Sequence, residues 1–473
     1  MKKNFAILPY NSTQVKDKTL VTTFLGSWDL LDKDEFMDLH AFRIKKDSPL
    51  FKRLHKKGLI IDEHNLDDRL EKYRNLNSHL FADTSLHIAV ITTRCNLNCA
   101  YCQTKTSKPK DMDPNVANRV LTYLFGVRNP NVVLEFQGGE PLLNWDVLAF
   151  LIEHARKFNT TGKNLKLALV SNLLLLDDKK IKFLIKHDVE ICASLDGPKF
   201  IHDKNRVYDN GAGSYEQVVS ILKRLKNKYH KSINLLPTIT KYSLRYPEEI
   251  VDEYLKFGQM EIALRPVNQM GTACSNWEQL GYTPEEFIGF YSKAMDYILT
   301  LNNKGILIRE RMARMISEKI LRGRNPGYVE LMNPCGAGRT TIAYMPDGTC
   351  FPCDEARMTG DEMFKIGDIL SMDYEQCMKS ENLLHLSHAS SVNLWAYNSP
   401  FAPWLGFCPI VNYATEKNLV PKISCSAAHK IYTYQFQYIF EKIAESQNYL
   451  KIFKDWTGGD DEKKSENKNK KIQ

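Results

Sequence analysis

The chain has 473 residues, of which 43% are hydrophobic and 25% charged, a balance typical of a globular protein rather than a disordered or membrane-embedded one. Its 64 basic and 56 acidic residues give a net charge of +8, which is weak support for a polyanionic partner. No apolar stretch reaches the length that spans a bilayer, and no basic helix with interleaved aromatic residues predicts nucleic-acid binding. An acidic peptide substrate would also suit this charge.

The 11 cysteines are clustered along the chain rather than evenly spread. In a chain of this length, such clustering favours iron–sulfur ligation in a reducing compartment over a disulfide framework. Residues Met1–Pro9 begin like a secretory signal, but their apolar run is too short and no small-residue cleavage site follows. We therefore expect a cytoplasmic protein.

Residues 1–75 predict a small module of short strands followed by short helices. Thr19–Gly26 alternates apolar and polar residues, as a half-buried strand does. Helices are expected around Asp34–Phe36 and from Pro49, where Ser48 can cap the helix and proline fits its first turn. The pattern suggests a winged-helix-like module that recognises a peptide by strand pairing. A structural cap on the next domain would explain it equally well.

From residue 82 to 305 the chain alternates apolar strands with amphipathic helices, a pattern typical of parallel β/α packing. Six strands are predicted, at Leu86–Thr92, Val132–Phe136, Leu165–Val170, Val189–Ser194, Ile233–Ile239 and Ile262–Arg265. Helices are predicted between them, at Pro114–Leu124, Asp146–Phe158, Lys179–Lys186, Tyr215–Lys226 and Pro247–Phe257. In a barrel of this kind, functional residues lie at the C-terminal ends of the strands.

Three cysteines follow the first of these strands in a C-x3-C-x2-C run, at Cys95, Cys99 and Cys102. Three thiolates can hold three irons of a [4Fe–4S] cube, whereas an electron-transfer cluster normally has four protein ligands. The fourth iron then keeps an open coordination position. The alternatives are a zinc knuckle without its fourth ligand, or chance clustering of buried cysteines.

The cysteine run, with Tyr101 before its last thiol, and the segment Gln137–Pro141 resemble the two signature motifs of the radical S-adenosylmethionine (SAM) superfamily. The resemblance implies a partial (β/α)6 TIM-like barrel with a SAM-binding [4Fe–4S] cluster on Cys95, Cys99 and Cys102. It also implies reductive cleavage of SAM to a 5′-deoxyadenosyl radical that takes a hydrogen atom from the substrate. A reductant such as flavodoxin or ferredoxin would then be a partner.

The loops after the first four strands converge on one face of the predicted barrel. By the resemblance, the SAM contacts lie there, at Tyr101, Gly138, Gly139, Glu140, Asn172 and Ser194. The two glycines would let the backbone approach the ligand closely, and Glu140 would contact the methionine ammonium group. Asn172 and Ser194 would hydrogen-bond the ribose or carboxylate, and the Tyr101 backbone would reach the adenine.

Three passages narrow the resemblance: Leu134–Asn144, Ser194–Pro198 with His202–Arg206, and Cys353–Met358. From about residue 5 to 440 the chain resembles the His-Xaa-Ser system radical SAM maturases (HxsB), which modify ribosomally synthesised peptides (RiPP biosynthesis). The resemblance implies a ribosomally made peptide or protein substrate and a second radical SAM protein as partner.

Residues 306–445 resemble a SPASM domain, the auxiliary iron–sulfur module of such maturases. Cys335, Cys353 and Cys408 match its cluster ligands. Cys350 stands in a local C-x2-C with Cys353 and could supply a fourth thiolate. A degenerate domain that binds zinc, or no metal, is the alternative.

A second auxiliary cluster is expected to be absent. When the closing SPASM motif is aligned on Cys408, Trp395, Asn398 and Trp404 stand where three further thiols belong, and Cys425 is the trailing cysteine. One thiol cannot replace four. The other cysteines have no partner in sequence and are expected to be buried apolar thiols: Cys192, Cys274 and Cys377.

Asp354 follows Cys353 directly and corresponds to an acid that sulfatase-type maturases use as a general base beside the auxiliary cluster. A partly desolvated carboxylate could have its pKa raised enough for this role. A surface ion pair with Arg357 is the alternative. Residues 457–473 contain almost nothing apolar and are expected to be a disordered tail.

The favoured function is therefore a radical SAM maturase that abstracts hydrogen from a peptide. Three alternatives stay open at this point: a peptide-binding scaffold that serves another radical SAM enzyme, an oxidase of a Cys or Ser residue similar to anaerobic sulfatase maturases, and a zinc-stabilised nucleic-acid-binding protein. The sequence does not decide which bond is made or which substrate residue is modified.

Overall fold

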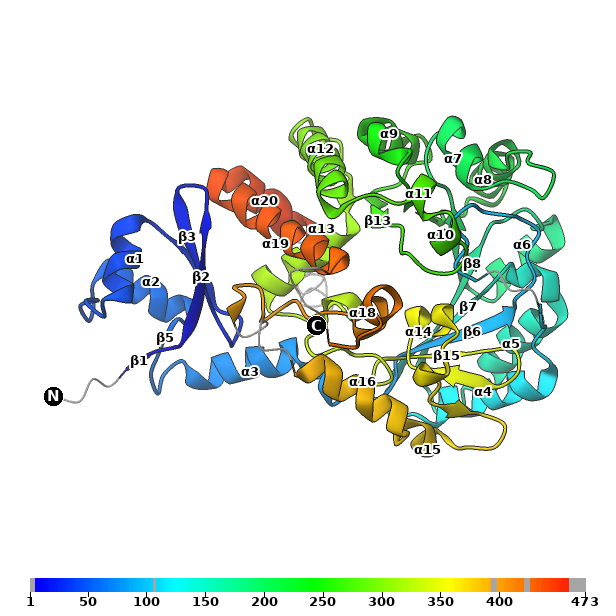
Figure 1. Cartoon of the computed structure of the whole chain (residues 1–473), viewed down its shortest axis with the longest axis horizontal. Helices are drawn as coiled ribbons and strands as arrows, with labels where there is room; N and C mark the ends of the chain where they lie inside the picture. The colour runs from blue at the N-terminus through cyan, green and yellow to red at the C-terminus, as the bar shows by residue number, and fades with distance from the viewer. Residues whose placement is uncertain (1–4, 105–107, 393–397, 421–425, 459–473) are drawn as a thin grey trace, which may run out of the picture.

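The computed structural model describes residues 5–104, 108–392, 398–420 and 426–458. At its centre, eight strands form one sheet in the order β10-β9-β8-β7-β6-β15-β16-β17 (Figure 1). Five neighbouring strands run parallel: β6 (Leu86–Thr92), β7 (Asn131–Gly138), β8 (Asn164–Ser171), β9 (Val189–Ser194) and β10 (Asn234–Leu236). Beyond β6, the sheet continues with β15 (Thr341–Tyr344), which runs parallel to β6. Next comes β16 (Thr349–Phe351), antiparallel to β15, and then β17 (Gly367–Asp368), antiparallel to β16.

Two short parallel strand pairs follow β10 along the chain. They are β11 (Thr238–Ile239) with β13 (Arg265–Pro266), and β12 (Glu261–Ile262) with β14 (Arg309–Glu310). The connecting helices are α4 (Pro114–Gly126), α5 (Trp145–Phe158), α6 (Asp178–Lys186), α7 (Lys199–Asn205), α8 (Tyr215–Tyr229), α9 (Pro247–Lys256) and α12 (Pro284–Asn303). Each predicted strand position contains a strand, so the α/β class with parallel β/α units is confirmed.

Local sequence chemistry sets where these elements begin. The Asp113 carboxylate accepts hydrogen bonds from the backbone N–H groups of Asn115 and Val116, and Pro114 occupies the first turn of α4. The strands read as continuous apolar runs because helices cover the sheet: six of the seven residues of β6 are buried.

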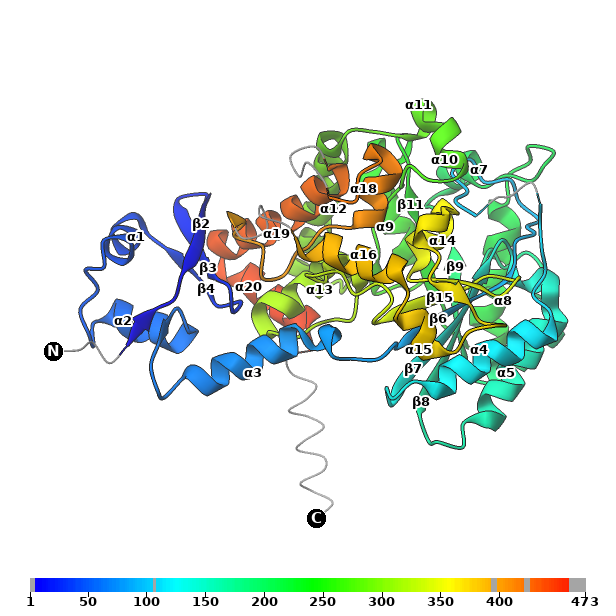
Figure 2. The same cartoon turned by 60° about the horizontal axis from the view of Figure 1, so that its bottom comes forward.

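The N-terminal residues form a small module at one end of the molecule (Figures 1 and 2). Its antiparallel sheet consists of β2 (Tyr10–Val15), β3 (Lys18–Thr23) and β4 (Trp28–Leu31), and β1 (Ala6–Ile7) pairs separately with β5 (Ile60–Ile61). Its helices are α1 (Lys33–His40), α2 (Pro49–Lys57) and α3 (Leu66–Leu76). The cap predicted for α2 is present, because Ser48 Oγ accepts a hydrogen bond from Phe51 N at 3.1 Å.

Further helices follow along the chain. They include α13 (Arg311–Ser317) with the short π-helix η4 (Glu318–Arg322), α14 (Asp354–Thr359), α15 (Tyr374–Met378), α16 (Glu381–Ser391), α18 (Pro409–Glu416), α19 (Ala427–Glu445) and α20 (Gln447–Trp456). Residues 459–473 of the predicted tail lie outside the described residues. In the part of the chain that the structure covers, no helix has the length and apolarity to cross a membrane. The predicted domain boundaries stay predictions.

The sheet centre gives a stability test. Leu134 in β7 is fully buried between β6 and β8, so Leu134→Ala leaves a cavity and lowers the free energy of unfolding by about 2–5 kcal/mol. Leu307→Ala is the matched control, because 69% of this side chain is exposed and its unfolding free energy should stay within about 0.5 kcal/mol of wild type. Urea denaturation measures both, and equal effects would contradict this placement of the core.

Candidate active site

One cavity of about 530 Å³ lies at the C-terminal ends of the parallel strands. The loops after β6, β7, β8 and β9 all contribute to its wall, as the sequence predicts. The predicted site residues that line it are Cys95, Cys99, Tyr101, Cys102, Gly138, Gly139, Asn172, Ser194, Cys353 and Asp354. The structure therefore places the first cysteine group and part of the second on one cavity.

The three thiols of the first loop are close enough to affect one another. Burial, followed by the nearby Cys102 and Cys95, raises the pKa of Cys99 to about 12, and the positive charge of Arg206 opposes that rise. Among the described residues, no three His, Cys, Asp or Glu side chains surround a point where a single metal ion could sit. A cube needs a different arrangement, because each thiolate binds its own iron.

Backbone hydrogen bonds hold the cysteine loop against the segment after α7. Asn98 N donates to Val207 O at 2.7 Å, and Ala100 N donates to Asn205 O at 2.9 Å. On the other side, Asn276 Nδ2 donates to Ala100 O at 2.9 Å. The loop is thus fixed by distant parts of the barrel, which makes it a preformed cradle for a cluster.

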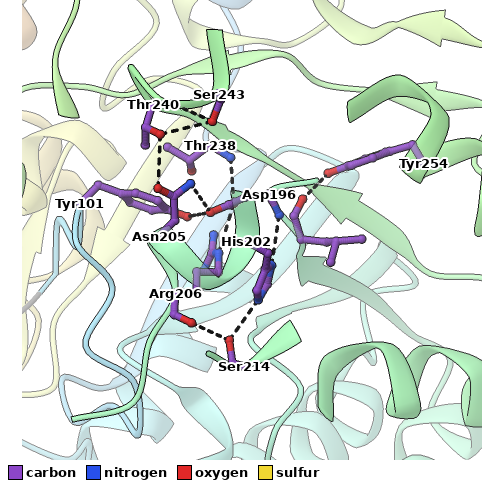
Figure 3. Close-up of polar contacts among 11 residues, drawn as sticks. Tyr101, Asp196, His202, Asn205, Arg206, Ser214, Thr238, Thr240, Ser243 and Tyr254 are labelled. Atoms are coloured by element: carbon purple, nitrogen blue, oxygen red, sulfur yellow. Dashed lines mark hydrogen bonds and ion pairs between the residues drawn. The ribbon is translucent and has the colours of Figure 1, made fainter. Parts of the chain in front are cut away.

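A buried carboxylate ties these segments together (Figure 3). Asp196 is fully buried, and its Oδ2 accepts hydrogen bonds from Tyr101 Oη at 2.6 Å and Asn205 Nδ2 at 3.1 Å. Its Oδ1 accepts from Arg206 Nε at 3.2 Å and Thr238 N at 3.1 Å. One side chain therefore connects the cysteine loop, the end of β9, the segment after α7 and β11.

Arg206 is a site residue that the sequence reasoning missed. Its guanidinium lies 5.3 Å from the centre of the Tyr101 ring, lines the cavity and acts on the nearby Cys99. His202 holds the same turn, since its Nε2 is 3.0 Å from Ser214 Oγ, which donates to Arg206 O at 2.8 Å. Burial lowers the pKa of His202 to about 4, so this link is neutral.

The two glycines of the second motif pack closely on the cysteine loop, and their predicted contact with SAM stays a prediction. A Cβ on Gly138 would lie 2.1 Å from Thr92 O, and a Cβ on Gly139 would lie 2.1 Å from Arg94 O. Gly139 N also donates to Thr92 O at 2.9 Å. Glycine is required here because the end of β7 packs directly on the start of the cysteine loop.

Glu140 is held by the ends of β7 and β8, and its predicted contact with SAM stays a prediction. Glu140 is fully buried and is not among the described residues that line the cavity. Its Oε1 accepts from Ser171 Oγ at 2.8 Å and Leu142 N at 3.1 Å, while its Oε2 accepts from Asn172 N at 2.8 Å. Burial raises the pKa of this carboxyl to about 7. Glu140 is a positioning residue that joins the ends of β7 and β8.

Asn172 and Ser194 both face the cavity, and their predicted contacts with SAM stay predictions. Asn172 Nδ2 donates to Asn96 Oδ1 at 2.8 Å and lies 4.0 Å from Cys95 Sγ. Its Oδ1 accepts from Leu174 N at 3.0 Å. This side chain therefore supports the first cysteine from the end of β8.

The second cysteine group contains three of its four predicted members. Cys335 and Cys353 belong to one small buried cluster, against which Cys408 packs. Cys350 is not brought to this group: its Sγ lies 3.6 Å from the Sγ of Cys377, on the other side of β16, where successive residues face opposite ways. The prediction that Cys350 is the fourth ligand is therefore wrong. The prediction that Cys377 is a buried apolar thiol is confirmed, since it is fully buried in the hydrophobic core.

Two other expectations about cysteines also change. Cys274 is exposed and Cys192 is half-buried in the cavity wall, so neither is a fully buried apolar thiol. Trp404 is fully buried. Trp395 and Cys425, which bear on the predicted loss of a second auxiliary cluster, lie outside the described residues.

Asp354 forms the ion pair that was the alternative to its role as a base. Its Oδ1 accepts from Arg357 Nε at 2.7 Å, and Arg357 Nη2 donates to Gln137 Oε1 at 2.7 Å. Arg357 is buried and Asp354 lines the cavity, so the pair lies in the cavity wall rather than at the surface. The role of Asp354 as a base stays a prediction.

The sequence reasoning gave no role to three other carboxyls of the cavity. Glu330 stands in no motif, whereas Glu135 and Glu355 lie within the passages Leu134–Asn144 and Cys353–Met358. Burial raises the pKa of Glu135 and of Glu355, and it raises that of Glu330 to about 7. All three line the cavity. A carboxyl whose pKa is close to neutral can both release and accept a proton there.

Comparison with known proteins agrees with this geometry. The family model of the radical SAM superfamily matches residues 89–254. The cysteine-type anaerobic sulfatase-maturating enzyme of Clostridium novyi is 25% identical over 383 residues, covering 77% of this chain and 96% of that enzyme. The uncharacterized protein MJ0907 of Methanocaldococcus jannaschii is 31% identical over 176 residues, and this match covers 37% of the chain and only 60% of that protein.

Solved structures share the fold. The structure of native anSMEcpe with bound AdoMet (SAM) superposes with a TM-score of 0.66 at 20% identity, covering 76% of this chain and 98% of that one. Streptococcus suis SuiB bound to precursor peptide SuiA gives a TM-score of 0.53 at 14% identity, covering 87% and 96%. The superfamily match places a radical SAM enzyme domain at residues 89–254, and the cysteine loop lies within it. Its cofactors are those of the superfamily, a [4Fe–4S] cluster and SAM, and auxiliary clusters are typical of its SPASM-type relatives.

Asp196 gives the first test of the site. Asp196→Asn leaves Arg206 buried without its counter-ion, which lowers the free energy of unfolding by about 3–5 kcal/mol, and the loosened loop should bind less iron after reconstitution. Tyr101→Phe is the milder control, because it removes one hydrogen bond and costs about 1.5 kcal/mol. Urea denaturation of the cluster-free protein and iron analysis measure both. Equal losses would show that the ion pair does not hold the loop.

Iron content tests the two cysteine groups. We expect about eight irons per anaerobically reconstituted chain, falling to about four in the triple variant Cys95→Ala/Cys99→Ala/Cys102→Ala, because the second group keeps its own cluster. Iron and sulfide analysis with EPR spectra gives the count. A fall from about four to none would mean that the second group binds no cluster.

Proposed function

We propose that this enzyme is a maturase that modifies a ribosomally made peptide by hydrogen abstraction. The observation that carries the proposal is that one cavity is lined both by Cys95, Cys99 and Cys102 and by Cys353. A substrate residue in such a cavity would be within reach of both groups. The named activities of the sulfatase-maturating relatives and of mycofactocin maturase MftC from Mycolicibacterium smegmatis support a peptide or protein substrate.

The bound cluster and SAM supply the carbon radical that removes a hydrogen atom. The chain's own residues hold and complement that chemistry. The Asp196 network fixes the cysteine loop, and the positive charge of Arg206 next to Cys99 favours the thiolate that a cluster requires. Glu330 and Asp354 line the cavity and can accept the proton that a substrate loses when it is oxidised.

The finer proposal is a maturase of the His-Xaa-Ser system. Its support is the sequence likeness in Leu134–Asn144, in Ser194–Pro198 with His202–Arg206, and in Cys353–Met358. The substrate would then be a short peptide encoded beside this gene, with a second radical SAM protein and a flavodoxin or ferredoxin as partners. The N-terminal module is the proposed docking element for that peptide.

A second candidate is an oxidase of a Cys or Ser residue like the sulfatase maturases. The specific observation in its favour is Asp354, which lines the cavity directly after Cys353. The likeness to the Clostridium novyi enzyme along 77% of the chain adds support. A cysteine-containing sulfatase peptide is the substrate that separates this candidate from the first.

The decisive experiment uses the anaerobically reconstituted chain with dithionite, SAM and the neighbouring peptide. We expect release of 5′-deoxyadenosine and a mass change of the peptide, and a fall to the no-enzyme background in Cys99→Ala. Release that is the same in wild type and Cys99→Ala would overturn the proposal. Tight peptide binding without a mass change, with turnover only when the partner enzyme is added, would favour a scaffold instead.

A further inference from the structure

A second cavity, of about 210 Å³, lies between the N-terminal module and the short π-helix η4. It shares no lining residue with the active-site cavity. Five of its lining residues carry positive charge, and the described lining contains no Asp or Glu: the five are Lys57, Arg69, Lys72, Lys319 and Arg322. Such a one-sided charge is expected where an anion binds.

The clearest feature of this cavity is a buried lysine without a counter-ion. Lys319 is 2% exposed, and its Nζ donates to Leu331 O and, at 2.6 Å, to Trp404 O. One of its three N–H donors is left over. No carboxylate in the described part of the chain forms an ion pair with it, and burial alone lowers its pKa to about 7.

A second buried donor faces the same space. Trp404 is fully buried, and its indole Nε1 has no hydrogen-bond partner among the described residues. A buried donor left unpaired costs about 1–3 kcal/mol. A Cβ on Gly26 would lie 3.4 Å from Nε1 and 3.2 Å from Leu76 Cδ2, so the glycine keeps the space beside the indole N–H narrow but open.

The cations around these donors are only partly neutralised. Lys57 Nζ pairs with Asp29 Oδ1 at 2.5 Å. Arg69 donates to the carbonyls of Lys56 and Lys57 at 2.9 and 3.3 Å, but its Nε has no partner within the described ranges. Burial and the charge of Arg69 lower the pKa of Lys72. The positive charges here repel one another, and an anion would relieve that repulsion.

We propose that this cavity binds a small anionic group, a carboxylate or a phosphate, with the Lys319 ammonium and the Trp404 N–H as its inner donors and Arg69 and Lys72 at its rim. The group would come either from a free small anion or from an acidic side chain of a peptide. Because α3 provides the rim and η4 the inner wall, the bound anion would join the N-terminal module to the rest of the enzyme. This site does not depend on the proposed maturase activity.

Calorimetry of the full-length protein at low salt tests the proposal with two probes, inorganic phosphate and an acetylated, amidated tetraglutamate peptide. We expect saturable binding of at least one probe, weakened about 10-fold by Trp404→Phe, which removes the N–H but keeps a ring, and about 10-fold by Lys72→Ala. Lys56→Ala is the matched control: both lysines are exposed on the N-terminal module and lose the same charge, but Lys56 does not line the cavity.

Each outcome has a defined meaning. Binding of phosphate alone would assign the site to a free anion, and binding of tetraglutamate alone would assign it to an acidic side chain. Absence of binding for both probes at about 10 mM, which is about ten times the dissociation constant of a weak ligand (about 1 mM), would overturn the proposal. Equal weakening by Lys56→Ala and Lys72→Ala would also overturn it, because the effect would then be general charge. If Trp404→Phe does not fold, the rim pair of lysine variants still decides.

Discussion

The position of the cysteine loop depends on one buried carboxylate. Asp196 is fully buried, and a charge at such a depth is tolerated only when it is paired and fully hydrogen-bonded. Arg206 supplies the opposite charge, and Tyr101, Asn205 and Thr238 complete its hydrogen bonds. Since these partners come from the cysteine loop, the segment after α7 and β11, the charge can be satisfied only when all these segments are in their native places.

A second buried carboxylate performs the same task at the opposite side of the loop. Glu140 links the ends of β7 and β8 through Leu142, Ser171 and Asn172, and the preceding Gly139 packs on the backbone of Arg94. The cysteine loop is therefore held between two polar junctions. Both acids are fully buried, and each holds the residues around the loop in place through its hydrogen bonds.

The strands and the first cysteine group could be predicted from the sequence because both signals are local. Buried apolar runs mark β6 to β9, and three thiols within eight residues share one loop whatever the rest of the fold is. Cys350 shows where local reasoning fails. A C-x2-C spacing suggests a shared site, yet Cys350 belongs to β16 and points toward Cys377, while Cys353 lies beyond the end of that strand at the start of α14.

Contacts between side chains that are far apart in the sequence could not be predicted either, because no local pattern indicates them. Asp196 and Arg206 lie within the passages Ser194–Pro198 and His202–Arg206, but nothing in the sequence shows that both side chains meet Tyr101 in the fold. The raised pKa of Glu330 likewise comes from burial beside Glu355, which belongs to a segment 25 residues later in the chain. A sequence motif identifies residues that are close along the chain. Which of these side chains contact one another, and how burial shifts their pKa values, depends on the packing of the whole fold.

The net charge of the chain also could not predict where a charged partner would bind. A net charge of +8 over 473 residues is too small to locate a partner, and it is compatible with a protein in which acidic and basic residues are evenly mixed.

The fold does not distribute acidic and basic residues evenly. The active-site cavity has Glu135, Glu330 and Glu355 together with its arginines, while the small cavity at η4 has five cations and no described acid. Because electrostatic attraction falls with distance and with screening by water and salt, an anion responds to the local arrangement rather than to the sum. When Lys319 is protonated, its ammonium is the charge in this cavity that solvent screens least, because the side chain is buried.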